Sequence, residues 1–176
     1  MPEPESINGQ DCPFCNTKNL TLLEREDEIP YFGQVYLFSM SCSKCKFHKA
    51  DVESVESKAP IKYSIEVSGE KDANIRIVKS SQATVKIPHI VTIEPGETSN
   101  GYITNVEGLL NRVKHQIETV RDEDEDPAVK KKAKNMLKKI SRTLWGAEKL
   151  RITVEDPSGN SAIISDKAVV ERLKAK

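Results

Sequence analysis

The sequence has no long apolar run and no excess of either charge. No hydrophobic stretch approaches the ~20 residues that a membrane-spanning helix requires, and the first residues, MPEPESINGQ, lack the character of a signal peptide. The 27 lysines and arginines balance 27 aspartates and glutamates, whereas a nucleic-acid-binding protein usually carries net positive charge. These absences predict a cytoplasmic protein that binds no membrane, and they argue against nucleic acid as a partner.

Signatures of catalysis are also missing. The sequence contains no P-loop, dinucleotide-binding fingerprint or nucleophile motif. His89 and His115 are isolated, and we interpret them as exposed or hydrogen-bonded side chains. Asp156, Ser158 and Ser161 fall in one turn with no suitably spaced base, so the turn alone explains them. The sequence therefore predicts a protein that is not an enzyme.

Cysteine is scarce but ordered. The only four cysteines form two pairs, Cys12 and Cys15 in CPFC and Cys42 and Cys45 in CSKC. In a reducing compartment such pairs indicate metal ligands or redox dithiols. Two pairs at this spacing predict one structural Zn²⁺ held by four thiolates, whose closed shell leaves no position for water or substrate. Two labile disulfides or free buried thiols are the alternatives.

The residues around the cysteines predict a small finger at residues 10–52. Its apolar content is too low for it to fold alone, and zinc binding worth roughly 10–16 kcal/mol can supply the missing stability. A strand at residues 35–40 would bring the two cysteine turns together. His48 can in principle replace a thiolate, but with four cysteines present we expect it at the surface or beside the ligands.

After the finger, residues 53–60 form a polar linker that ends in proline, and residues 61–176 read as a β domain. Apolar residues alternate with polar ones in IKYSIEV, as in a half-buried strand. IRIV, ATVKIPHIVTIEPG, KLRITV and SAII add further short strands separated by turns. Such strands without crossover helices predict an antiparallel sandwich or barrel-like fold.

A helical hairpin interrupts this domain at residues 104–146. Thr104 and Glu107 match a capping box at the start of a helix with a continuous apolar stripe. A second helix begins at Asp126-Pro127, where proline suits the first turn. A short terminal helix is expected at residues 166–174. Its inward-facing residues would be Val169, Val170 and Leu173.

Two features of the second helix have a structural and a functional interpretation. The basic stretch VKKKAKNMLKK can bind RNA, but Lys130, Lys134 and Lys138 share one side of the helix, which favours a solvated face. Trp145 is interpreted as a packing anchor rather than as a binding platform.

Four motifs follow the first cysteine pair: EIPYFGQVYLFSMSC, ATVKIPHIVTIEPG, ITNVEGLL and EDPSGNSAI. In this order the chain resembles the ZPR-type zinc-finger proteins, which in eukaryotes bind translation elongation factor one alpha. The resemblance covers residues 11–164. It implies a mainly β fold with a helical insertion (α+β), in which a four-cysteine finger precedes a double-stranded β-helix or jelly-roll-like domain with an αα-hairpin. It also implies zinc on Cys12, Cys15, Cys42 and Cys45.

The chain departs from the family in two ways. Eukaryotic members contain two modules, whereas this chain has one and resembles the single-module form typical of archaea. Where the family shows Gly-Tyr after the second cysteine pair, this chain has Lys46-Phe47. The resemblance implies binding of the elongation factor, a GTPase, with a folding or maturation chaperone role. The alternative is a nucleic-acid-binding zinc ribbon in transcription or RNA handling, supported by Lys44, Lys46 and Lys49.

The partner is expected to contact the finger loop and the hairpin tip. The loop EIPYFGQ contributes Ile29, Tyr31 and Phe32, apolar residues that a small finger can hardly bury together. Alternatively, Phe32 packs inside the finger and only Tyr31 is free. At the hairpin tip the carboxylates would meet a basic patch on the partner. They belong to Asp122, Asp124 and Asp126.

Overall fold

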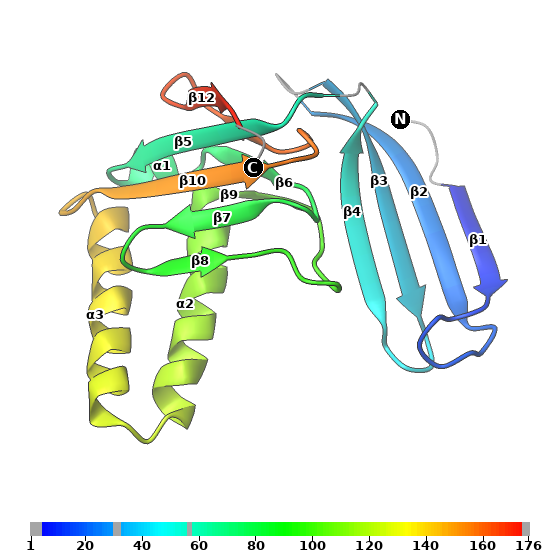
Figure 1. The fold of residues 1–176 in the computed structure, drawn as a ribbon, viewed down its shortest axis with the longest axis horizontal. Helices are drawn as coiled ribbons and strands as arrows, with labels where there is room; N and C mark the ends of the chain where they lie inside the picture. The colour runs from blue at the N-terminus through cyan, green and yellow to red at the C-terminus, as the bar shows by residue number, and fades with distance from the viewer. Residues whose placement is uncertain (1–4, 30–32, 56–57, 174–176) are drawn as a thin grey trace.

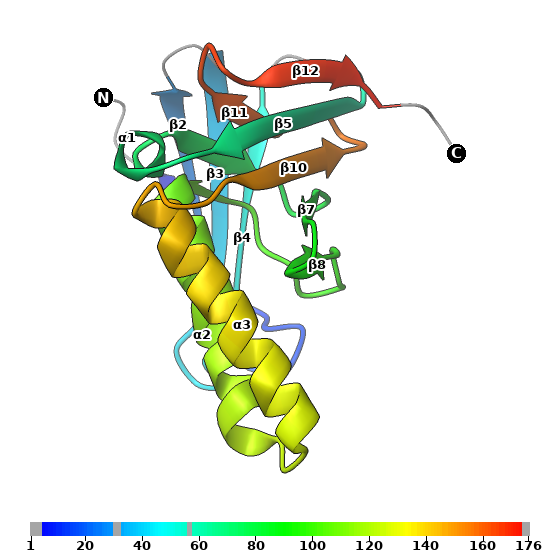
Figure 2. The ribbon, with the colours of Figure 1, turned by 90° about the vertical axis from the view of Figure 1, so that its left-hand side faces the viewer.

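The computed structural model describes residues 5–29, 33–55 and 58–173. A four-stranded sheet lies beside a larger β domain, from which a pair of helices extends (Figure 1). In the view turned by 90°, the helical pair runs well beyond the strands that carry it (Figure 2). None of the helices in these ranges is long and apolar enough to cross a membrane.

The finger is an antiparallel sheet in the order β1-β2-β3-β4. Its strands are β1 (Glu5–Gln10), β2 (Leu20–Ile29), β3 (Gly33–Cys42) and β4 (His48–Ser54). The pairing of β2 with β3 is continuous and sets Leu20 opposite Cys42. Because Cys12 lies between β1 and β2, this register brings the two cysteine turns to the same end of the sheet. The predicted strand at residues 35–40 is thus part of a longer one.

The β domain contains two sheets, in the orders β12-β5-β10-β7-β8 and β11-β6-β9. A four-residue helix, α1 (Glu70–Ala73), stands where a plain turn was predicted. The predicted mainly β fold with a helical insertion is confirmed. The strands are β5 (Ile61–Val67), β6 (Arg76–Lys79), β7 (Thr84–Ile87), β8 (Val91–Ile93), β9 (Tyr102–Asn105), β10 (Leu150–Asp156), β11 (Ala162–Ile164) and β12 (Val169–Arg172).

The inserted hairpin consists of α2 (Val106–Glu123) and α3 (Pro127–Leu144). The predicted capping box at Thr104 is wrong, because Thr104 belongs to β9 and pairs with Ile77. Asn105 caps α2 instead, and its side chain accepts a hydrogen bond of 2.8 Å from the Gly108 N–H. Asp126 caps α3 in the same way, with Pro127 in the first turn as predicted.

The predicted terminal helix at residues 166–174 is wrong within its described part. Val169–Arg172 form strand β12, which pairs with β5 at the edge of the five-stranded sheet. Val169 and Val170 are exposed rather than inward. The β5 edge supplies backbone hydrogen bonds for this segment, and a long-range partner of this kind overrides local helical spacing.

The β domain and the finger have separate cores joined at a shared boundary. The main core lies under the helical hairpin and includes Leu109, Leu110 and Ile140. A second cluster spans the junction, where finger residues such as Val35 and Val52 meet the β domain. Its buried members are Ile29, Val35, Val52, Val78 and Ala162.

Backbone hydrogen bonds also fix the finger against the β domain. The Gly101 N–H donates to the Ala50 carbonyl at 2.9 Å, and the Ala50 N–H donates to Asn100 Oδ1 at 2.8 Å. A Cβ added at Gly101 would lie 2.8 Å from the Val52 nitrogen and would also meet Asp51. Glycine is therefore required at this close approach.

Candidate metal centre and partner surfaces

The two cysteine pairs are held in two matching turns. The Asn16 N–H donates to the Cys12 carbonyl at 2.9 Å, and the Lys46 N–H donates to the Cys42 carbonyl at 3.1 Å. Asn16 and Lys46, each directly after a pair, have left-handed φ angles of 51° and 61°. Asparagine tolerates this conformation, whereas lysine does so at a cost. Lys46 therefore occupies a position at which the backbone conformation favours glycine, the residue that the family resemblance gives there.

The four sulfurs converge at one point. All lie within 4.8 Å of one another. Cys12 Sγ is 3.6 Å from Cys45 Sγ, and Cys15 Sγ is 3.7 Å from Cys42 Sγ. A tetrahedral zinc ion with Zn–S bonds of about 2.3 Å separates its sulfurs by about 3.8 Å. The cysteines are not paired in disulfides, and the site fits one structural zinc ion.

Electrostatics also favour a cation at this point. The Thr17 hydroxyl, 3.1 Å from Cys15 Sγ, lowers the pKa of Cys15 to about 6. The backbone N–H groups of Cys45 and Lys44 lower the pKa of Cys42. A hydrogen bond from the Phe47 N–H favours the Cys45 thiolate, but loss of hydration and the neighbouring sulfurs raise the pKa of Cys45 to about 12. A divalent cation would remove this conflict, because zinc binding displaces the remaining protons.

His48 is not part of the sulfur cluster. It begins β4 and is exposed, and its Nδ1 lies 2.9 Å from the Ser41 hydroxyl. The imidazole therefore bonds a side chain of the neighbouring strand, and the four cysteines form the cluster without it.

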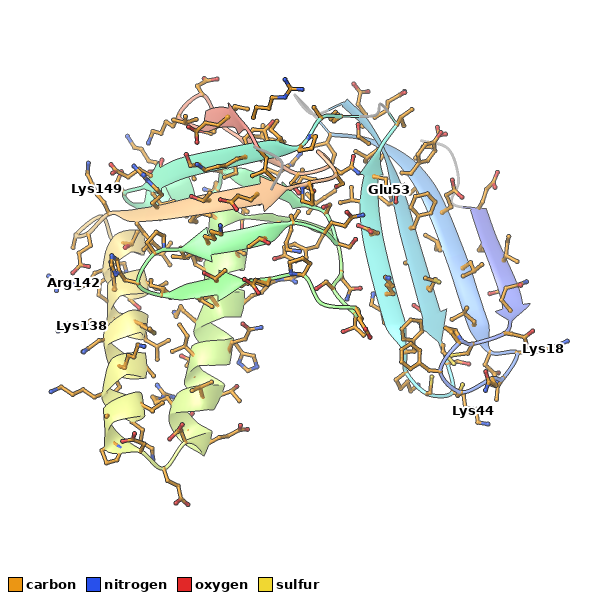
Figure 3. The ribbon with its side chains drawn as sticks, in the orientation of Figure 1. Lys18, Lys44, Glu53, Lys138, Arg142 and Lys149 are labelled. Carbon is orange, nitrogen blue, oxygen red and sulfur yellow. The ribbon has the colours of Figure 1, made fainter. Side chains whose placement is uncertain are left out.

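Two aromatic rings, exposed Phe14 and half-buried Phe47, are in contact at the metal end of the finger. Phe14 is 64% exposed, and its ring lies 4.5 Å from that of Phe47 at an angle of 30°. Lys18 and Lys44 occupy the same end (Figure 3). Phe14 was not among the residues predicted to contact a partner, although an aromatic residue inside a Cys-x-x-Cys turn has little core to enter, which was a usable signal.

The predicted finger-loop surface is only partly described. Ile29 is 3% exposed and belongs to the junction cluster, so its side chain is not available to a partner. Burial against the β domain, which sequence patterns do not reveal, is the reason. Tyr31 and Phe32 lie outside the described residues.

The three aspartates at the hairpin tip have different surroundings. The Asp122 carboxylate accepts hydrogen bonds of 2.7 and 2.9 Å from the Arg121 guanidinium, which lowers the pKa of Asp122. Asp124 Oδ1 accepts from the Asp126 N–H, and Asp126 Oδ1 accepts from the Ala128 N–H, both at 2.8 Å. The carboxylates of Asp124 and Asp126 thus stabilise the turn between the helices as well as carrying charge.

Trp145 is not a packing anchor. It caps the C-terminal end of α3 and is 83% exposed. Helix α3 ends at Leu144, directly before Trp145, and Gly146 turns the chain away with a left-handed φ of 79°. The interpretation of this residue from the sequence is therefore wrong.

Known families and relatives match nearly the whole chain. The family model described as the ZPR1 zinc-finger domain matches residues 5–60, and that of the ZPR1 jelly-roll domain matches residues 71–175. A ZPR1-like protein of Methanocaldococcus jannaschii is 38% identical over 92% of this chain and 83% of its own length. A ZPR1-like protein of Pyrococcus horikoshii is 33% identical over 96% and 78%. The zinc finger chaperone zpr1 of Schizosaccharomyces pombe is 32% identical over 77% of this chain, but over only 30% of its own length.

Proposed function

The chain belongs to the ZPR1 zinc-finger family, and we propose that it is a zinc-dependent chaperone that binds the GTPase translation elongation factor one alpha. Cys12, Cys15, Cys42 and Cys45 are its proposed zinc ligands. A four-thiolate shell supports a structural role for the metal and a non-enzymatic function. The fission yeast relative is named a zinc finger chaperone, which supports a protein partner. We place this interaction in the cytoplasm.

The observation that carries this proposal is the aromatic pair at the metal end of the finger. Phe14 exposes most of its ring, whereas Cys12, Leu20 and Cys42 form a buried cluster at the same end of the finger. Exposed aromatic residues on a rigid support are typical interface anchors. Zinc would hold the turn that carries Phe14, so the same metal that folds the finger would position its contact surface.

The hairpin tip would contribute charge to the same encounter. It lies far from the β sheets (Figure 2), and Asp122 and Asp126 are exposed there. Charges at an interface rim change the association rate more than the affinity. Tyr31 remains a further proposed anchor in the finger loop.

Isothermal titration of the zinc-loaded chain with the elongation factor tests the anchors. Phe14→Ala and Tyr31→Ala should each weaken binding by about 1–3 kcal/mol, as truncated anchors do. Ile7→Ala is the matched control, because Ile7 is a similarly exposed apolar residue of the finger at 56%. Equal affinities for the wild type and both anchor variants would exclude the finger as the contact surface.

Stopped-flow association tests the tip. Asparagine replaces Asp122, Asp124 and Asp126 in one variant, because its amide oxygen can still accept the turn hydrogen bonds at the last two positions. Association should become slower, and the difference should shrink at high salt. An unchanged rate at low salt would remove the tip from the interface.

Nucleic acid is the second candidate partner, and the finger end supports it. Phe14 offers an open ring face for a base, and Lys18 and Lys44 lie at the same end (Figure 3). Because the chain has no net charge, binding to a single-stranded RNA oligonucleotide should disappear by about 0.2 M salt. Tight binding at that ionic strength, measured by fluorescence anisotropy, would make nucleic acid the leading candidate.

A further inference from the structure

A hollow opens where α1, the start of α2 and the end of α3 meet. Its volume is about 630 Å³, and α1 contacts both longer helices. This end of the hairpin is opposite the acidic tip (Figure 1). The lining residues are Glu70, Ala73, Asn74, Glu107, Leu144 and Trp145.

Trp145 is the most exposed large apolar residue of the described chain, at 83%. Leaving an indole in water forfeits the burial that a large aromatic side chain normally contributes to stability. Across the part of the chain that the structure describes, no cation lies over its ring. Exposed tryptophan is enriched among the residues that dominate protein interfaces, so Trp145 offers a free aromatic surface at the edge of the hollow.

The charged groups of the hollow are acidic. Within the described ranges neither Glu70 nor Glu107 forms an ion pair. Arg142 and Lys149 lie at this end of the molecule (Figure 3), but each already has a carboxylate partner. Arg142 pairs with Glu148 at 3.1 Å and Lys149 with Glu66 at 2.7 Å. The negative pole at the C-terminal end of α3 is offset by the positive pole at the start of α2, so the acidic character of the hollow comes from the two carboxylates.

We propose that this hollow binds an arginine- or lysine-bearing segment of a protein partner. The cationic group would lie over the face of the Trp145 ring, because tryptophan gives the strongest cation–π attraction of the aromatic side chains. The two free carboxylates would supply the complementary charge. Leu144, half-buried beside the indole, would contact the aliphatic part of the bound side chain. This site is separate from the finger and the hairpin tip, so it does not depend on the identity of the partner there.

Trp145 is the only tryptophan of the chain, so its fluorescence reports on this site alone. The zinc-loaded full chain is titrated with the blocked peptide Gly-Arg-Gly-Arg-Gly, and with Gly-Glu-Gly-Glu-Gly as the acidic control. The basic peptide should change the emission saturably, with a dissociation constant on the order of 0.1–1 mM for one weak site. The acidic peptide should produce no saturable change.

Charge variants make the test specific. Glu70→Gln with Glu107→Gln should weaken binding of the basic peptide at least tenfold. Glu94→Gln with Glu97→Gln removes the same charge from an exposed segment after β8 and should leave binding unchanged. Isothermal titration with Trp145→Ala, which needs no fluorescence, should show the same loss as the first variant. Absence of saturable binding, or equal weakening in both glutamine pairs, would overturn the proposal.

Discussion

Removing the buried carboxylate of Asp156 should destabilise the β domain strongly. Asp156 is 0% exposed and accepts hydrogen bonds from three serines. These come from Ser80 Oγ at 2.8 Å, Ser161 Oγ at 2.5 Å, and the N–H and hydroxyl of Ser158 at 2.8 and 2.7 Å. Lys79 is also buried, at 3% exposed, and its Nζ donates to the Ser80 carbonyl at 2.9 Å.

Asp156→Ala removes one of the two carboxylates, with Asp51, whose charge offsets the burial of Lys79, and it leaves the serine donors without an acceptor. A buried donor left unsatisfied costs about 1–3 kcal/mol, so the loss of several such hydrogen bonds is a large part of a typical stability of about 5–15 kcal/mol. Asp156→Asn keeps the shape and one acceptor oxygen, so its cost should be smaller, about 1–3 kcal/mol. Asp166→Ala, at an exposed position, is the control and should change stability by less than about 0.5 kcal/mol.

The loss should also depend on pH. Burial lowers the pKa of Lys79, and the charges of Asp156 and Asp51 oppose that effect. Without Asp156 the pKa of Lys79 falls further below its unfolded value. Above the folded pKa the unfolded chain binds more protons than the folded one, so stability rises with pH. The deficit of Asp156→Ala relative to wild type should therefore shrink between pH 7 and pH 10.

Urea unfolding followed by far-UV circular dichroism measures both effects. The three variants are compared with wild type at pH 7, and Asp156→Ala is also compared at higher pH. An Asp156→Ala protein within about 0.5 kcal/mol of wild type at pH 7 would refute this reasoning. A deficit that grows with pH would refute the assigned role of Lys79.

Three further predictions concern the metal, an ion pair and the domain junction. Metal analysis should find about one zinc per chain. Cys42→Ser should empty the site and loosen the finger, while the separate main core stays folded. Full zinc retention by the Cys42→Ser protein would contradict the four-thiolate site. Buried Asp72 pairs with Lys167 at 2.6 Å. Desolvation alone would raise the pKa of Asp72, but the hydrogen bonds from Lys167 and Ser68 outweigh it and lower that pKa. Asp72→Asn should therefore cost about 1–3 kcal/mol at pH 7. That cost should vanish as pH falls through the folded pKa of Asp72, and acid titration of the unfolding free energy checks it. Gly101→Ala should lower the free energy of unfolding in urea by about 1–3 kcal/mol, because the new methyl group meets the Val52 nitrogen. An unchanged free energy of unfolding would mean that the backbone at the junction shifts to accommodate the methyl group at little cost.

The features that the sequence predicted correctly are those encoded locally. The two Cys-x-x-Cys turns carry their own geometry, and the strand pairing only has to bring them together. The helices α2 and α3 follow from apolar spacing and from Asp126-Pro127 at a helix start. These signals lie within a few residues of each other, so one sequence suffices to detect them.

The errors arose where a distant segment decides the structure. β12 is a strand because β5 offers it an edge, although the two are separated by more than 100 positions. Asp156 seemed to be a simple turn residue, but Ser80, 76 positions away, completes its buried network. Ile29 was expected at the partner surface, and it is buried only because the β domain packs against the finger.

Binding of the elongation factor by zinc-loaded and zinc-free protein tests the central claim most directly. Isothermal titration of elongation factor one alpha with the zinc-loaded chain should give saturable one-to-one binding. The same titration with Cys42→Ser, after circular dichroism has confirmed that its β domain is folded, should give none. Equal binding by both proteins, or no binding by the zinc-loaded chain, would contradict the account.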